Sequence, residues 1–163
     1  GKVYRGTRYQ NCIVNLYWYI KMLAVVLLLV ISALIVKNIH EDERVVEVKA
    51  KYKKLREHLI NTHEEDFRKI YQPKPLIIKH KRNKTPGYNT NKGSEIGLCL
   101  DGTVNDMFHV LLHELVHCVV EEYSHSEEFW NKFAKLTNIA VQIGVYTKIS
   151  EQKEFCGSHV IDK

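Results

Sequence analysis

The sequence contains little of what marks fibrous, repetitive or disordered proteins. Its 163 residues include 3 prolines and 8 glycines, which excludes a collagen-like or low-complexity chain. No internal repeat is visible, and this argues against a solenoid or a propeller. Charged residues make up 26% of the chain, close to the average for globular proteins, so wholesale disorder is not expected. The length suits one domain of ordinary size.

Acidic residues are absent from the first 40 positions, and this absence accounts for the whole net charge. The five basic residues there equal the formal charge of +5, and the remaining 19 basic residues offset the 19 acidic ones. The basic composition therefore says little about DNA or RNA. Contact between nucleic acid and the basic run at residues 79–84 stays a weak expectation, because such a run is more often a solvated loop.

Closely spaced cysteines are also missing. Cys12, Cys99, Cys118 and Cys156 are scattered without a C-x-x-C pair, so nothing indicates a zinc site built from cysteines alone. We expect free buried thiols if the domain faces a reducing compartment, with one disulfide as the alternative.

One long apolar run lies near the start. Residues 16–36 form about 31 Å of helix at about 1.5 Å per residue, which matches a bilayer core of about 30 Å. Tyr17, Trp18 and Tyr19 stand at one end, where aromatic rings favour the headgroup region. We expect an uncleaved membrane anchor. A cleaved signal peptide and a buried soluble helix are the alternatives, and no small-x-small cleavage motif follows the run.

The remainder predicts a mixed α and β domain. Apolar residues at helical spacing indicate amphipathic helices over about 42–62 and 104–120. A third helix is expected to open near Ser124, whose S-x-x-E spacing to Glu127 is typical of a capping box, and to stop near Gly144. Residues 76–78 and 96–100 read as short strands, with an Asn/Gly-rich loop between them.

The chemistry is concentrated in His113-Glu114-Leu115-Val116-His117, an H-E-x-x-H motif within the second of these helices. Histidines four residues apart project from one helical face, so both imidazoles can bind the same metal ion. Glu114 is placed to act as the base toward a metal-activated water. Burying two histidines and a glutamate without partners would be costly, and a metal removes that cost.

A catalytic zinc site needs a third protein ligand, and His125 is our choice. Capping by Ser124 would place His125 in the first turn of the next helix. The rival oxygen ligands are glutamates of the same segment, whose usual meaning is a solvated connector: Glu121, Glu122, Glu127 and Glu128. Cys118 is expected to be a small core residue, and His109 either supports the site or lies on the surface.

Residues 108–136, FHVLLHELVHCVVEEYSHSEEFWNKFAKL, resemble the core of the WLM-type zinc metallopeptidases, which are similar to SprT-like proteins. The likeness is greatest to the short WLM-like proteins of large DNA viruses, because Ile96–Leu100, Gly144–Tyr146 and Phe155–Gly157 match their segments. This resemblance implies zinc at His113, His117 and His125, with Glu114 catalytic. Cellular relatives are associated with digesting proteins crosslinked to DNA, but the spacing to His125 is longer than expected for them.

We therefore expect an N-terminal flank at 1–15, a transmembrane helix at 16–36 and an α+β, zincin-like metallopeptidase domain at 41–163. One Zn²⁺ ion would activate water against a protein or peptide substrate, with Tyr123, Tyr146 or His109 as guesses for the oxyanion donor. The flanking charges favour a cytoplasmic domain on a single-pass protein of the host or virion membrane if the chain is viral. The alternatives are a catalytically idle zinc module that binds partners at a membrane, and a chance motif in a structural membrane protein. No residue pattern indicates the oligomeric state.

Overall fold

The chain, seen in a computed structural model, divides into two compact units, residues 1–41 and 42–163. The structure describes the backbone of residues 6–39, 41–80 and 85–162, and their side chains except those of 6–12, 38 and 39. The expected strand residues fall inside these ranges, whereas most of the basic run at 79–84 lies outside them.

The first unit is the single long helix α1 (Gly6–Ile39). Its segment Ile13–Lys37 is long and apolar enough to cross a membrane, and no part of the segment's most apolar window is buried. An apolar helix of this length that is exposed all round needs an apolar environment. Signal sequences have the same length and apolar composition, so α1 contains one candidate membrane span.

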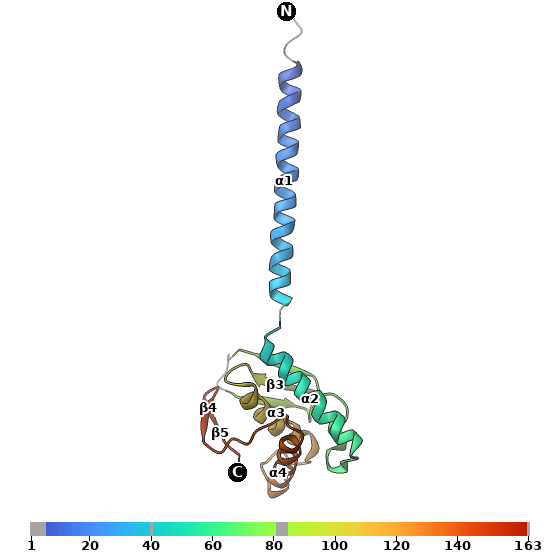
Figure 1. The fold of residues 1–163 in the computed structure, drawn as a ribbon, viewed down its shortest axis with the longest axis vertical. Coiled ribbons are helices and arrows are strands. Elements are labelled where there is room, and N and C mark those ends of the chain that lie inside the picture. The colour runs from blue at the N-terminus through green and yellow to red at the C-terminus, as the bar shows by residue number, and fades with distance from the viewer. Residues whose placement is uncertain (1–5, 40, 81–84, 163) are drawn as a thin grey trace, which may run out of the picture. The chain divides into compact units, whose positions relative to one another are not determined.

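The second unit holds the helices α2 (Glu43–Asn61), η1 (Glu65–Ile70), α3 (Val104–Val119) and α4 (Glu127–Gln142). Its strands are β1 (Leu76–Lys79), β2 (Gly87–Thr90), β3 (Glu95–Cys99), β4 (Lys153–Phe155) and β5 (Ser158–Val160). Figure 1 shows α3 inside the domain, flanked by the sheet and by the other helices. The contacts agree, because α3 touches α2, η1, β2, β3, α4 and β5.

The three helices predicted from periodicity are present, and their apolar faces make the core. In α2 the buried side chains are apolar residues spaced three and four apart, as the predicted amphipathic helix requires: Val45, Val48, Tyr52, Leu55 and Leu59. In α3, 12 of the 16 side chains are buried, as the central position of the helix requires. Thr103 caps α3 through a capping box with Asp106, and α4 ends before Gly144, whose φ of 71° suits glycine after a helix.

The principal sheet has the order β1-β3-β2, with β1 parallel and β2 antiparallel to β3. β2 forms from the Asn/Gly-rich segment that the sequence assigned to a loop, so that expectation was wrong. Four residues with little hydrophobic alternation gave no strand signal, and the strand depends on its pairing with β3. β2 therefore occupies one edge of this sheet.

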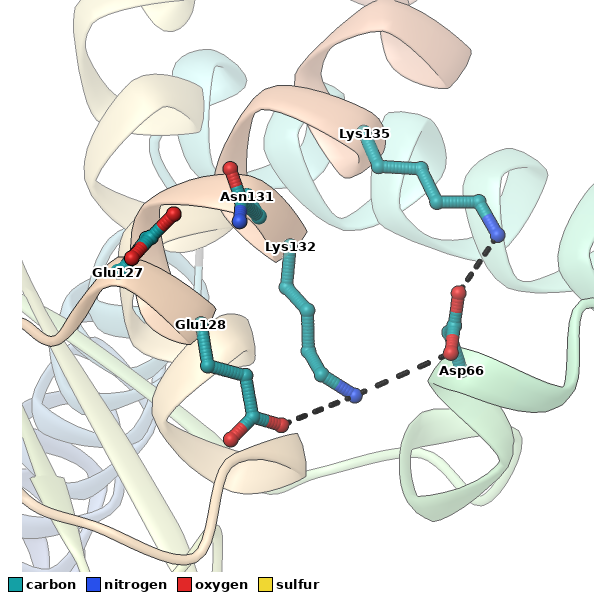
Figure 2. Close-up of a pocket in the computed structure, with 6 residues that line it drawn as sticks. All are labelled: Asp66, Glu127, Glu128, Asn131, Lys132 and Lys135. Atoms are coloured by element: carbon teal, nitrogen blue, oxygen red, sulfur yellow. Dashed lines mark hydrogen bonds and ion pairs between the residues drawn. The ribbon is translucent and has the colours of Figure 1, made fainter.

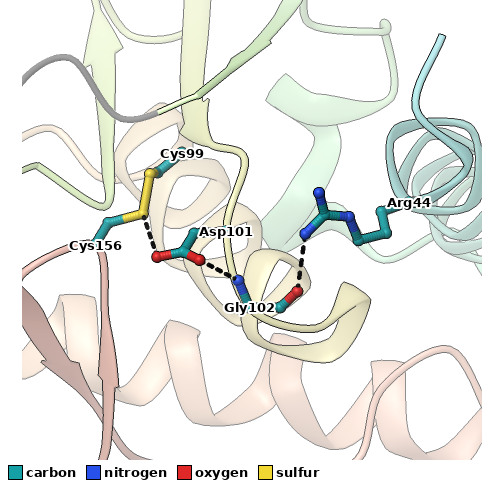
Figure 3. Close-up of a disulfide and its surroundings, with 5 residues drawn as sticks. All are labelled: Arg44, Cys99, Asp101, Gly102 and Cys156. Carbon is teal, nitrogen blue, oxygen red and sulfur yellow. Dashed lines mark hydrogen bonds between the residues drawn. A yellow bond between two sulfur atoms is a disulfide. The ribbon is translucent and has the colours of Figure 1, made fainter.

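Cys99 and Cys156 form a disulfide that joins the end of β3 to the β4–β5 hairpin. Figure 3 shows the pair beside Asp101, whose carboxylate also accepts a hydrogen bond of 2.8 Å from the backbone N–H of Gly102. Among the described side chains, Cys118 alone is the free, buried thiol that was expected, and the disulfide is the alternative that the sequence left open. The pairing links positions 57 apart in sequence, which no local spacing could have indicated.

Candidate metal centre

His113 and His117 lie on one face of α3, one turn apart, with their rings half-buried. The Nε2 atoms of the two rings are 3.3 Å apart, and the Nε2 atoms of His113 and His125 are 2.9 Å apart. Ligand atoms of all three residues lie within 4.8 Å of one another. The predicted ligands are therefore brought together in space.

These separations can be compared with the geometry of a zinc ion. Zinc–nitrogen bonds of about 2.0–2.1 Å at tetrahedral angles put two ligand nitrogens about 3.3–3.4 Å apart. The 3.3 Å between His113 and His117 equals that edge, and the 2.9 Å to His125 is shorter by a few tenths of an ångström. These two edges are close to those of one small divalent ion of the zinc type, and all three donors lie within 4.8 Å of one another.

The protonation states suit metal binding. Burial, followed by the neighbouring imidazoles, lowers the pKa of His113 to about 3. Burial, followed by the neighbouring His125 ring and the Lys92 ammonium group, lowers the pKa of His117 to about 4. Both rings are therefore neutral near pH 7, which is the form that offers a lone pair to a metal. Burial alone raises the pKa of Glu114 to about 7, so its carboxyl group can exchange a proton near neutrality.

His125 comes from the connection between α3 and α4 and not from a helical turn. The expectation that Ser124 caps α4 was wrong, because the cap is Ser126, whose hydroxyl accepts a hydrogen bond from the backbone N–H of Phe129. Ser124 instead donates to the Glu122 carboxylate at 3.0 Å. His125 therefore stands just before the cap, on an exposed loop.

Aromatic side chains of α4 support the three imidazoles. The buried ring of Phe129 has its centroid 4.9 Å from that of His113, 4.6 Å from His117 and 4.7 Å from His125. Trp130 stacks on His125 at 5.6 Å. Phe129 stands four positions after His125 in the sequence, but its central contact with all three rings was not expected.

The imidazoles open into a cleft of about 300 Å³ between α3, β2 and the His125 loop. Its lining consists of Gly87, Tyr88, Asn89, His113, Glu114, His117, Tyr123 and His125. Gly87 allows β2 to come close, because a Cβ at this position would lie 2.5 Å from Val110 and 3.2 Å from the Glu114 carboxylate. Edge strand and glutamate therefore share one wall of the cleft.

Asn89 fastens this strand to α3. Its Nδ2 donates to the backbone carbonyl of Glu114 at 2.8 Å, and its Oδ1 accepts from the backbone N–H of Gly93 at 2.8 Å. Sequence reasoning missed Asn89 because the segment around it was read as a loop. The available signal was Gly87-Tyr88-Asn89, which precedes the strand predicted at residues 96–100.

The rival glutamate ligands lie elsewhere. Figure 2 shows Glu127 and Glu128 in a separate polar hollow between α4 and η1, where Glu128 pairs with Lys132 at 3.5 Å. Glu121 pairs with Lys69 on the surface. Glu122 accepts the Ser124 hydroxyl, so none of the four belongs to the cluster formed by the described histidines.

Two of the three guessed oxyanion donors are not among the residues that line the cleft. Tyr146 is buried, and its hydroxyl lies 2.8 Å from His109 Nδ1 and donates to the Asp162 carboxylate. His109 is buried in the same network, which ties the C-terminal residues to α3. Tyr123 does line the cleft, with 71% of its surface exposed.

The comparisons with known proteins agree with this geometry. The family model described as the WLM domain matches residues 75–162, more than half of the chain. The chain belongs to the WLM family. This WLM domain contains β1, β2, β3, α3, α4 and the C-terminal hairpin, and so the entire histidine cluster. Membership makes it a peptidase-like domain of the zinc-metallopeptidase type.

A curated relative is the Uncharacterized protein R325 of Acanthamoeba polyphaga mimivirus, which is 34% identical over 90 residues. The match covers 49% of this chain and 45% of the relative, so the chain spans less than half the length of that protein. A viral relative is consistent with the likeness to WLM-like proteins of large DNA viruses. No solved structure matches the chain.

Proposed function

We propose that this protein is a membrane-anchored, zinc-dependent metallopeptidase that hydrolyses peptide bonds in proteins, with a small zincin-like domain. One observation carries the proposal. Three imidazoles converge at a cleft beside a buried carboxyl group that α3 itself supplies. A structural zinc site usually closes its fourth position with Cys or His, whereas three protein ligands and an open cleft suit catalysis.

His113, His117 and His125 would hold the ion. When bound, zinc activates water and polarises the carbonyl group of the scissile bond. Glu114 accepts the proton of the attacking water and returns it to the leaving amine. Its burial serves this role because a carboxyl group with a pKa near 7 both takes up and releases protons at neutral pH.

The edge strand β2 offers a way to bind the substrate. It is the outer strand of its sheet and lines the cleft through Gly87, Tyr88 and Asn89. An extended peptide can add to such an edge through main-chain hydrogen bonds. Recognition of this kind depends little on sequence and favours unfolded or loop segments of proteins.

The candidate span in α1 would anchor the protein in a membrane. The flanking charges favour a cytoplasmic domain, whereas the Cys99–Cys156 disulfide is typical of an oxidising compartment. Asn83-Lys84-Thr85 is an acceptor sequence for N-glycosylation. Expression in eukaryotic cells therefore distinguishes these two placements of the domain. A glycan that glycosidase removes from the full chain would place the domain in the lumen, and an unglycosylated, protease-accessible domain would place it in the cytoplasm.

The decisive experiment is Glu114→Gln in the full chain, purified in detergent and loaded with zinc. We expect an unchanged zinc stoichiometry and a loss of turnover on an unfolded protein substrate of at least about 100-fold, because general-base catalysis contributes about 10²–10⁴-fold. Glu127→Gln is the matched control, since this exposed glutamate lies in the other hollow.

Equal turnover by the Glu114→Gln variant and the parent would refute the general-base role. Zinc binding by a parent that hydrolyses none of the substrates offered would instead favour a catalytically idle interaction module. A parent that binds no zinc would leave the H-E-x-x-H sequence as a chance motif.

A further inference from the structure

The loop that carries His125 is held by a lysine from a different part of the fold. Lys92 lies in the turn between β2 and β3, and its ammonium group donates to the backbone carbonyls of Val120 at 2.9 Å and Glu122 at 3.0 Å. The same nitrogen lies 4.0 Å from the centroid of the Tyr123 ring. One side chain thus contacts three positions of the loop.

The carbonyls that Lys92 binds would otherwise have no regular partner. Val120 is the C-cap of α3, and after this residue the chain leaves the helix for the exposed connection to α4. The carbonyls at a helix C-terminus carry partial negative charge and favour a cation. Lys92 meets this requirement and at the same time closes the loop against the β2–β3 turn.

The turn itself is built to present Lys92. Asn91 and Lys92 both have left-handed backbone conformations, with φ values of 45° and 55°, which non-glycine residues seldom adopt. Asn89 fixes the base of the turn to α3 through its bonds to Glu114 and Gly93. A strained turn that is fastened to the metal-bearing helix gives Lys92 a defined position relative to His113 and His117.

We propose that Lys92 is a positioning residue for the metal centre: it sets the path of residues 120–125 so that His125 reaches the ion held by His113 and His117. The inference rests on the proposed zinc site. The helix fixes two ligands by its own geometry, whereas the third comes from a connection that has no regular structure. Lys92 supplies the missing constraint.

The charge of Lys92 and its positioning role predict opposite changes in zinc affinity when Lys92 is replaced. An ammonium group close to the site repels a divalent cation, so removing the charge alone would tighten zinc binding. Weaker binding after Lys92→Met would therefore report lost positioning. Methionine keeps an unbranched side chain beside Tyr123 and removes both hydrogen bonds.

We would measure zinc affinity by chelator competition on the full chain in detergent. We expect Lys92→Met to weaken zinc binding about 10–100-fold, the range found when groups that orient ligands are removed. Lys92→Arg, which keeps donors for both carbonyls, should recover most of the loss. Lys69→Met is the matched control, because Lys69 pairs with Glu121 of the same loop from an exposed position. It should leave the affinity unchanged.

A double-mutant comparison separates positioning from general destabilisation. If Lys92 acts through His125, Lys92→Met should add no further weakening in a His125→Ala background. The visible spectrum of the Co²⁺-substituted Lys92→Met protein should likewise shift toward that of His125→Ala. Thermal unfolding of the metal-free variants reports whether each of them folds.

Unchanged zinc affinity in Lys92→Met, beside a parent that binds zinc, would overturn the inference and leave the proposed function intact. Equal weakening in the parent and His125→Ala backgrounds would also overturn it, because the effect would then be structural. A parent without zinc binding would overturn the proposed function and, with it, the role given to Lys92.

Discussion

Helix α3 and the loop that follows it bring imidazoles to the same cluster in two different ways. His113 and His117 are related by one helical turn, and the helix that carries them is buried on nearly all sides. His125 is exposed, belongs to no helix or strand, and is placed by contacts with other side chains. The comparison teaches that a periodic pattern can define part of a site while tertiary contacts define the rest.

The difference extends to what holds each part in place. The helical pair depends on backbone hydrogen bonds and on the core, which a single surface substitution does not disturb. The loop depends on a few anchors: Lys92 at its start, Ser126 at its end and Trp130 against the imidazole. We therefore expect substitutions in the loop to affect the metal more than the stability of the domain.

The largest effect should come from removing the ligands themselves. His113→Ala should weaken zinc binding by more than about 100-fold, above the range for groups that only orient ligands, because one helical histidine cannot chelate alone. His125→Ala should weaken binding less, since the helical pair remains. Zinc quantification beside chelator competition measures both, with the exposed His159→Ala as the control. Full occupancy in His125→Ala would show that the loop contributes a different ligand.

The disulfide should have the next largest effect, on stability rather than on the metal. It closes a segment of 57 residues, and the chain-entropy model gives about 4 kcal/mol at 25 °C for a loop of this length. Cys156→Ser should lower the free energy of unfolding by up to this amount. Zinc affinity should change little, because no residue of the hairpin lines the cleft.

Denaturant unfolding with and without reductant provides the measurement. Reductant should destabilise the parent and leave Cys156→Ser unaffected, since Cys118 is the other described cysteine and is unpaired. If reduction of the disulfide, without denaturant, releases zinc, the hairpin also supports the metal centre. The hairpin would then be a third region, beside the helix and the loop, that holds the site in place.

The sequence predicted those parts of the fold that depend on local periodicity. The core faces of α2, α3 and α4 and the partners His113 and His117 follow from spacings of three and four residues. β2 was missed because its stability comes from its pairing with β3 and from the hydrogen bond of its own Asn89 to the Glu114 carbonyl of α3, which are tertiary contacts. The β4–β5 hairpin and the disulfide depend in the same way on distant residues.

The cap of α4 shows the limit most clearly. Ser124 and Ser126 both precede the apolar pattern, and the Glu127 spacing favoured Ser124. In the folded domain Ser126 is the cap, and Ser124 bonds to Glu122 instead. The two-residue error moves His125 from a helical turn into the loop. It changes what holds the third histidine in place, although the residue itself was predicted.

The smallest effects should come from replacing the two helix caps. Both replacements should lower the stability of the domain equally, so any difference in zinc affinity between them reports on the loop and not on the helix. Thr103 caps α3 and Ser126 caps α4, and replacing either with alanine should cost about 1 kcal/mol of stability. Only Ser126→Ala should also weaken zinc binding, by a few fold, because His125 is the residue immediately before this cap. Thr103 lies more than two turns of α3 before His113, so its loss should leave the metal unaffected. Matched unfolding and chelator titrations on the two variants decide the matter, and equal zinc affinities would mean that the aromatic contacts of His125 hold the loop without help from the cap.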